Sequence, residues 1–158
     1  MRLEILDNRA VGSTSDTSER YEYHFTDNFL GWRTFSLPWS SFTRRSDWQP
    51  VGAPNNGLTL SQVWGYDFSS LSGSGAFALD QNQLVKATQT SNLLMLENFE
   101  SGNLSSWVPF NDLNSTFNIS LASPGQAGQY SMQMDANIAA NGWGGAGKYF
   151  SASQNWST

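Results

Sequence analysis

Short runs in which apolar and polar residues alternate are the feature that most constrains this fold. Residues 117–121 read Phe-Asn-Ile-Ser-Leu, and residues 130–134 read Tyr-Ser-Met-Gln-Met. A period of two is that of a β-strand with one buried face and one wet face. Further runs of strand length, separated by Gly, Asn, Asp, Ser and Pro, are 2–6, 21–25, 32–39, 63–68, 75–80 and 92–99.

No run has the pattern of a convincing amphipathic helix; residues 58–64 offer at most one short turn. Many short strands without helices predict an all-β fold, an antiparallel two-sheet β-sandwich of the jelly-roll kind. The length of 158 residues fits a single domain, 1–158. The polar segment 86–92 is predicted to be a linker between strands.

Composition excludes several classes of partner. Charged residues make up only 13% of the chain, against about 25% in ordinary domains. The net charge is −5, and the basic residues form no block beyond Arg44-Arg45, which disfavours nucleic acid and anionic membrane surfaces. No run reaches the roughly 20 apolar residues of a membrane span. The absence of cysteine excludes disulfides and thiolate metal sites. Because charged residues are few, we expect a surface suited to neutral, polar ligands.

The densest motif lies in residues 40–68, where Arg45, Asp47 and Trp48 follow one another closely. A sugar ring has apolar C–H faces, against which an indole stacks, and hydroxyls that bind carboxylates and guanidinium groups. The three residues therefore form a candidate sugar site. Two structural interpretations stay open beside it: Trp48 as a packing residue, and Arg45 with Asp47 as an ion pair that fixes a turn.

The inventory of reactive residues argues against an enzyme. The single histidine, His24, lies in an alternating strand-like run, and no hydrolase or phosphate-binding motif is present. Glycoside hydrolysis needs two carboxylates about 5–10 Å apart. Glu97 and Glu100 could meet that distance only by chance, so we expect no catalytic residues.

Two stretches carry a family resemblance. "NFLGWRTFSLPWSSFTRRSDWQPVGAPNNGLTLSQVWGYDF", followed by "GSGAFALDQNQLV", resembles the C-terminal half of family 11 carbohydrate-binding modules. "LENFESGNLSSWVPF" and "GQYSMQMDANIAANGWGGAGKYFSASQNWS" resemble the N-terminal half of the same modules. Residues 1–85 thus match the later half, 86–92 link, and 93–158 match the earlier half. This permuted strand order fits either a circular permutation or a cut across two tandem modules.

The resemblance also implies a missing strand. Family members carry a further strand between the regions that match residues 153–157 and 2–6 here, so we expect a sandwich one strand short. Its unpaired edge would invite self-association by strand exchange. This is the basis of an alternative hypothesis, in which the chain is a structural repeat or filament subunit of an extracellular assembly.

The resemblance implies a non-catalytic module that binds β-glucan chains, mixed-linkage or cellulosic, and targets an attached glycoside hydrolase or further modules to polysaccharide. Such modules are extracellular or at the bacterial cell surface; no signal peptide is visible in this sequence. Its cleft would use the R-x-D-aromatic positions, together with further platforms and polar groups. The resemblance implies Arg45, Asp47 and Trp48 as ligand-binding residues, and Asp16 near a family position that contacts hydroxyls. Trp143 is a second candidate platform, with a structural Trp in a Gly-rich bend as the alternative. Trp107, like Trp32, Trp39, Trp64 and Trp156, is assigned mainly to core or loop anchoring, and it is also a candidate cleft wall.

Related jelly-roll modules commonly hold a structural calcium ion near the meeting of first and last strands. Calcium prefers several oxygen ligands, carboxylates and carbonyls among them. A solvated acidic turn is the alternative interpretation. The residues expected to bind Ca²⁺ are Asp80, Glu97, Glu100, Ser101 and Asn103.

Overall fold

The computed structural model describes residues 1–85 and 93–157, and the predicted linker 86–92 lies outside them. The described residues are almost entirely strand and loop; their only helix is a single 3-10 turn, Trp39–Ser41. The all-β prediction is therefore confirmed, and the antiparallel sheets are consistent with a β-sandwich. No helix of this part of the chain is long and apolar enough to cross a bilayer.

Two compact units make up the chain: residues 1–69 with 147–157, and residues 70–146. β5 and β6 belong to the second unit. The single domain of residues 1–158 stays a prediction.

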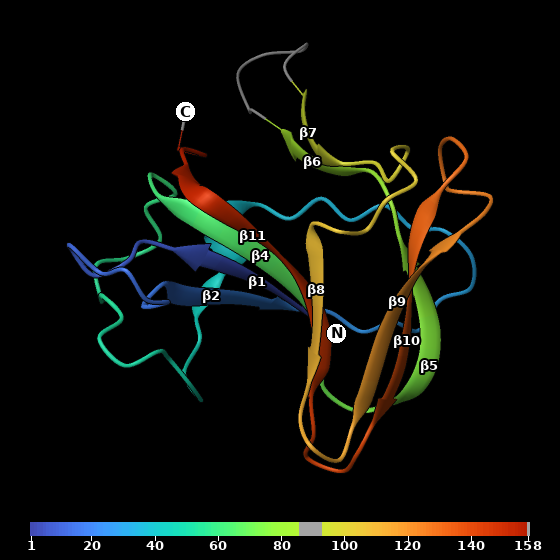
Figure 1. Ribbon diagram of the computed structural model, residues 1–158, viewed down its shortest axis with the longest axis horizontal. Helices are drawn as coiled ribbons and strands as arrows, with labels where there is room; N and C mark the ends of the chain where they lie inside the picture. Colours follow the sequence, from blue (N-terminus) through green and yellow to red (C-terminus); the bar gives the residue numbers. More distant parts are fainter. Residues whose placement is uncertain (86–92, 158) are drawn as a thin grey trace. The chain divides into compact units, whose positions relative to one another are not determined.

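The first unit is built on an antiparallel sheet in which β3, β2, β1, β4 and β11 lie side by side in that order (Figure 1). The strand order continues to β8, and residues 147–154 of β11 belong to this unit. The strands are β1 Arg2–Asp7, β2 Glu19–His24, β3 Thr43–Arg44, β4 Val63–Ser70, β8 Trp107–Asn111 and β11 Gly144–Gln154.

Strand pairing in this sheet gathers charged residues on one side. Glu4 lies opposite Glu22 of β2 and Asp67 of β4, and Leu6 lies opposite Arg20. Since side chains alternate along a strand, these residues share a face. We call this the polar face; its members are Arg2, Glu4, Arg20, Glu22, His24, Asp67 and Ser69.

The opposite face of the sheet is aromatic. Tyr23 packs on Phe42, and Tyr66 packs on Trp156, with ring centroids 5.9 and 6.0 Å apart. The backbone N–H of Trp156 donates to Leu60 O (2.7 Å), which holds the end of the chain in this cluster. This side is the hydrophobic core of the unit, in which aromatic rings pack with aliphatic residues such as Ile5 and Val63.

The strand predicted over residues 32–39 is wrong. The structure has irregular backbone there, followed by the 3-10 turn. Pro38 lacks the N–H that a ladder needs, and Phe35 instead contacts Phe25 and Phe29, with centroids 4.9 and 5.7 Å apart. Aromatic packing replaces strand pairing in this segment.

The second unit contains a three-stranded sheet in the order β5, β10, β9, and a hairpin of β6 with β7 (Figure 1). In the sheet, Met134 of β10 lies opposite Phe77 and Ile119, so the predicted alternation at 117–121 and 130–134 does form strands. Met132 and Met134 are fully buried. The strands are β5 Gly73–Leu79, β6 Asn82–Val85, β7 Leu93–Glu97, β9 Thr116–Ala122 and β10 Ser131–Ile138.

Candidate functional site

The candidate site lies in the first unit, where the segment after β3 reaches the polar face. Arg45 Nη1 donates to Glu4 Oε1 (3.1 Å) on β1. Its Nε and Nη2 donate to the two oxygens of Asp47, at 2.7 and 3.1 Å. One guanidinium therefore holds a buried carboxylate on one side and an exposed one on the other. A planar fork of donors suits this double task, which an ammonium group could not perform.

The Arg45–Asp47 pair is electrostatically matched. The hydrogen bond from Arg45 lowers the pKa of Asp47 below its usual value. Burial disfavours the charged form of Arg45, but the bond to Asp47 and the charge of Glu4 outweigh it and raise its pKa. Both groups are therefore charged at neutral pH. The Asp47 side chain is 66% exposed, so it keeps acceptor capacity for a ligand hydroxyl.

Trp48 presents its ring to solvent beside this pair. The residue is 48% exposed, which rules out a sealed packing role. The guanidinium carbons of Arg45 and Arg20 lie 5.2 and 5.8 Å from the ring centroid. Contacts of this kind orient an indole and restrict its rotation. The ring is thus a positioned aromatic platform with cations beside it.

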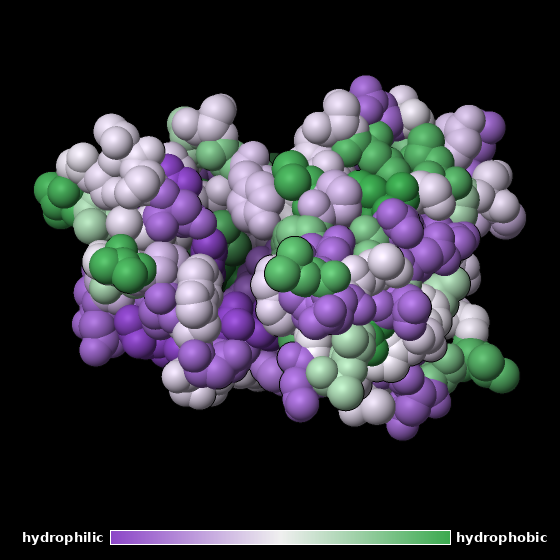
Figure 2. Space-filling view, turned by 60° about the horizontal axis from the view of Figure 1, so that its bottom comes forward, coloured by the Kyte–Doolittle hydropathy of each residue, from purple (hydrophilic) through white to green (hydrophobic). Residues whose placement is uncertain are grey.

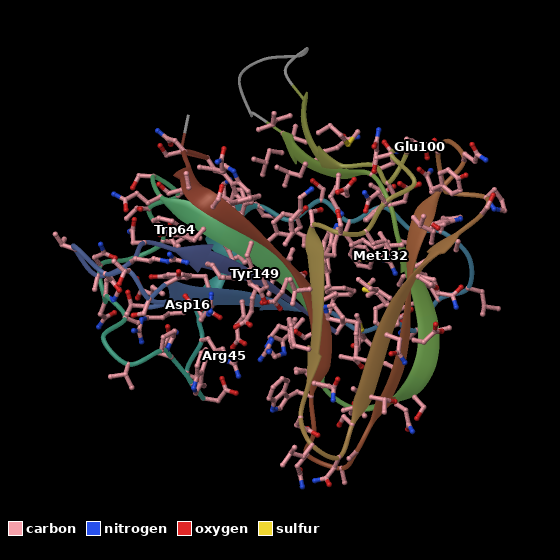
Figure 3. The ribbon with its side chains drawn as sticks, viewed as in Figure 1. Asp16, Arg45, Trp64, Glu100, Met132 and Tyr149 are labelled. Atoms are coloured by element: carbon pink, nitrogen blue, oxygen red, sulfur yellow. The ribbon has the colours of Figure 1, made fainter. Side chains whose placement is uncertain are left out.

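Asp16 reaches the same place from the loop between β1 and β2. Its Oδ2 accepts from Arg20 Nη2 at 2.5 Å, and its Oδ1 accepts from the Ser18 backbone N–H. Burial opposes ionisation of Asp16, yet the charge of Arg20 and these hydrogen bonds lower its pKa overall. Gln49 ties the next segment down by donating to the carbonyls of Arg20 and Arg45. Contacts through Arg20 and Arg45 thus bring together four predicted residues, Asp16, Arg45, Asp47 and Trp48; Figure 3 labels Asp16 and Arg45.

Arg20 and two carboxyl residues of the polar face were not among the predicted site residues. Glu4 is directly opposite Asp67, and both are buried. Burial, followed by the charge of Glu4, raises the pKa of Asp67 to about 8. The Ser69 hydroxyl donates to Asp67 at 2.9 Å. The sequence signal for this face was Arg2 with Glu4 in β1 and Arg20 with Glu22 in β2, since residues two apart in a strand point to the same side.

Tyr149 of β11 is a further aromatic residue of this unit, and it is 43% exposed. The backbones of β4 and β11 approach closely at Gly65, where an added Cβ would stand 2.5 Å from the Lys148 carbonyl oxygen and 3.2 Å from the Tyr149 ring. The close approach of the two backbones therefore requires glycine at this position.

On the face drawn in Figure 2, hydrophilic residues dominate the left part, where Figure 1 draws β1 and β2.

Two of the predicted ligand-binding tryptophans lie in the second unit. Trp107 is 4% exposed and packs on Phe99, so it is a core side chain there. Trp143 is 44% exposed, and its ring contacts Phe110 at 6.0 Å. Its backbone N–H donates to Asp112 (2.7 Å), which fixes the turn before β11. Trp143 therefore remains an accessible ring, whereas Trp107 does not.

The residues predicted to bind calcium have other partners. Glu100 accepts the backbone N–H groups of Gln129 and Tyr130, at 2.9 and 2.8 Å. Asp80 accepts those of Gln126 and Ala127, at 2.8 and 3.1 Å. Each carboxylate thus clamps the loop that precedes β10.

The remaining predicted calcium ligands also serve local turns. Glu97 accepts the N–H groups of Asn98 and Phe99, and Asn103 accepts that of Ser105. The Ser101 hydroxyl faces the Asn103 carbonyl at 3.5 Å. Within residues 1–85 and 93–157, no three His, Cys, Asp or Glu side chains converge as metal ligands would. Calcium stays a prediction that this geometry does not support.

Comparisons with known proteins place the chain in a family. Residues 1–87, more than half of the chain, match the carbohydrate binding domain (family 11). Endoglucanase H of Acetivibrio thermocellus is 33% identical over 82 residues, which are 51% of this chain and 9% of that protein. No solved structure matches the chain. The arrangement of an exposed indole beside arginine–carboxylate pairs lies within the matched residues, and the chain belongs to the family 11 carbohydrate binding domains.

Proposed function

We propose that this chain is a non-catalytic module that binds β-glucan chains, mixed-linkage or cellulosic, at Trp48 and its polar neighbours. The observation that carries the proposal is the half-exposed Trp48 ring, with the guanidinium carbons of Arg20 and Arg45 at 5.8 and 5.2 Å from its centroid. An uncharged glucan offers apolar C–H faces to the indole. Its hydroxyls can donate to Asp47 and Asp16, and accept from the arginines.

The affinity that such a site needs is modest. A micromolar dissociation constant corresponds to about 8 kcal/mol. Restricted side chains keep the entropic cost of binding low, because ordering each free side chain costs about 0.5–1.5 kcal/mol. In this site, hydrogen bonds hold Arg45, Asp47, Arg20 and Asp16 before any ligand arrives.

The biological role that fits this binding is delivery of an attached enzyme to polysaccharide. Support comes from the match to a short part of a protein named an endoglucanase, which is far longer than this chain. A module of this kind would act outside the bacterial cell, where insoluble or polymeric glucans are found. It would raise the local substrate concentration of its neighbour without taking part in hydrolysis.

Titration of intrinsic tryptophan fluorescence with barley β-glucan and with cello-oligosaccharides tests the proposal. We expect a saturable change whose midpoint lies in the micromolar range. A chain that responds to neither ligand, and to none of a broad panel of neutral glycans, would contradict the proposed function.

A further inference from the structure

A pocket in the first unit lies where the loop after β1 meets the residues before β4. It has a volume of about 330 Å³, at the lower end of the roughly 300–1,000 Å³ of ligand pockets. Arg45 follows β3 at one edge of the strand order, and Trp64 belongs to β4, so β2 and β1 lie between them (Figure 3). The lining side chains that could contact a ligand through polar or aromatic groups include Asn8, Arg9, Asn56, Gln62 and Trp64.

Arg9 is a positioned cation without a carboxylate partner. Its guanidinium carbon lies 3.9 Å from the Trp64 ring centroid, and its Nε donates to the Ser18 hydroxyl at 3.1 Å. In residues 1–85 and 93–157, Arg2, Arg20, Arg44 and Arg45 each pair with an acidic side chain, whereas Arg9 pairs with none. The two terminal nitrogens of Arg9 remain for a ligand, in the end-on geometry that carboxylates accept.

Two further groups of the pocket lining are donors with no acceptor among the described residues, the Asn56 side-chain NH₂ and the Trp64 indole N–H. Asn8 Nδ2 donates to Asn56 Oδ1 and Thr59 Oγ1. The Asn56 side-chain oxygen is therefore in use, and its NH₂ group is available to donate to a ligand. The Trp64 indole N–H has no acceptor within the described parts of the chain. Buried donors of this kind need an acceptor, which in native proteins is often water or a ligand.

A donor-rich pocket with one free guanidinium selects ligands that carry acceptors and a negative charge. Asp7, the nearest acidic residue in sequence, does not neutralise Arg9, because its oxygens accept the N–H groups of Thr59 and Leu60. A carboxylate on a sugar ring would satisfy the guanidinium fork, and the ring hydroxyls would meet the amides of Asn56 and Gln62. Contacts from amides and an indole alone would not distinguish one sugar ring from another. The guanidinium of Arg9 adds a preference for a sugar that carries a carboxylate.

We propose that the pocket at Arg9 and Trp64 is a second glycan site, which binds a uronic acid residue through its carboxylate. The proposal does not depend on the neutral-glucan site at Trp48. It assigns to one chain two sugar specificities, one neutral and one acidic, on separate parts of the same sheet. Polysaccharide that mixes neutral chains with uronate branches would engage both.

Nuclear magnetic resonance tests this on the full chain, with the Trp64 indole N–H as the reporter. We expect sodium glucuronate to shift that resonance saturably in the millimolar range, and glucose or inorganic phosphate at equal ionic strength to leave it in place. Arg9→Gln should weaken glucuronate binding at least tenfold, and Arg9→Lys should weaken it less. Trp48→Ala should leave glucuronate binding unchanged while neutral-glucan binding falls.

Several results would overturn the proposal. These are the absence of a saturable shift with glucuronate, an equal response to glucose or phosphate, and undiminished binding by Arg9→Gln. Loss of glucuronate binding in Trp48→Ala would place the acid at the first site instead. Unchanged melting temperatures of the Arg9 and Trp48 variants show that each comparison is made on folded protein. Failure of neutral-glucan binding alone, with glucuronate binding intact, would contradict only the function proposed above.

Discussion

Glu4 and Asp67 lie directly opposite each other on β1 and β4, on the same face of the sheet, and both are buried. Two like charges this close in a desolvated place are unfavourable. Glu4 has Arg45 and Arg2 as partners, at 3.1 and 3.5 Å, whereas the Ser69 hydroxyl donates to Asp67. Glu4 therefore pairs with the arginines of the site, whereas burial beside Glu4 raises the pKa of Asp67 and favours its protonated form.

The first prediction concerns stability against pH. Burial and Glu4 raise the pKa of Asp67 from its ordinary 3.8 to about 8. Below pH 4 the group is protonated in both folded and unfolded chains, so it favours neither. Between about pH 4 and 8 only the folded chain keeps the proton, so the free energy of unfolding contributed by Asp67 falls as pH rises. Urea unfolding at a series of pH values should show this fall in the wild type.

Asp67→Asn is the matched variant, because it keeps the shape and the acceptor for Ser69 without a titrating group. All other ionisable groups are shared, so the difference between the two stability curves isolates Asp67. The variant should gain on the wild type steadily from pH 4 to 8. Parallel curves over this range would show that Asp67 is ionised like an ordinary aspartate.

The second prediction concerns Arg45 as the link between the sheet and the site. Arg45→Met leaves Glu4 buried with Arg2 as its remaining partner. Removing one member of a buried ion pair costs about 3–5 kcal/mol, and we expect about 2 kcal/mol because Arg2 stays. Arg45→Lys should be intermediate, since an ammonium lacks the fork. Urea denaturation at pH 7 measures both; a methionine variant as stable as the wild type would contradict the link.

The third prediction concerns the loop before β10. Gly128 has φ +98°, and an added Cβ would stand 2.6 Å from the Glu100 carboxyl. Both the backbone angle and the nearby carboxylate therefore favour glycine at position 128. The N–H groups of Gln129 and Tyr130 lower the pKa of Glu100. Glu100→Gln should therefore speed hydrogen exchange of these two amides. The Phe99 amide is the internal control, because its N–H donates to Glu97 and its exchange should not change in Glu100→Gln.

The same exchange measurement addresses calcium. If Glu100 serves the backbone, adding calcium chloride should leave the exchange of Gln129 and Tyr130 unchanged. Slower exchange with calcium, abolished by Glu100→Gln, would instead make Glu100 a metal ligand. The acidic cluster in the sequence does not distinguish the two roles, because both need an unpaired carboxylate near backbone groups.

The local part of the site could be predicted from the sequence. Arg45, Asp47 and Trp48 are near neighbours in the chain, so one short turn brings them together. Asp16 came from the family resemblance rather than from spacing. The alternating strands of the second unit were also predictable, because a buried face leaves a period of two.

What the sequence did not reveal depends on strand register. Glu4 and Asp67 are far apart in the chain, and only the pairing of β1 with β4 places them opposite each other. β11 was missed because its first residues, Gly144 to Gly147, are glycine and alanine without alternation. The segment 32–39 was misjudged for the opposite reason: its aromatic residues resemble a strand but pack as an irregular cluster.

The most direct test of the central claim is isothermal titration of barley β-glucan into Trp48→Ala, beside the wild type and Trp143→Ala. Both rings are nearly half exposed, so either truncation should leave the fold intact. We predict micromolar binding by the wild type, at least a tenfold loss in Trp48→Ala, about 1.4 kcal/mol or more, and a smaller loss in Trp143→Ala. Wild-type affinity in a folded Trp48→Ala would contradict the account.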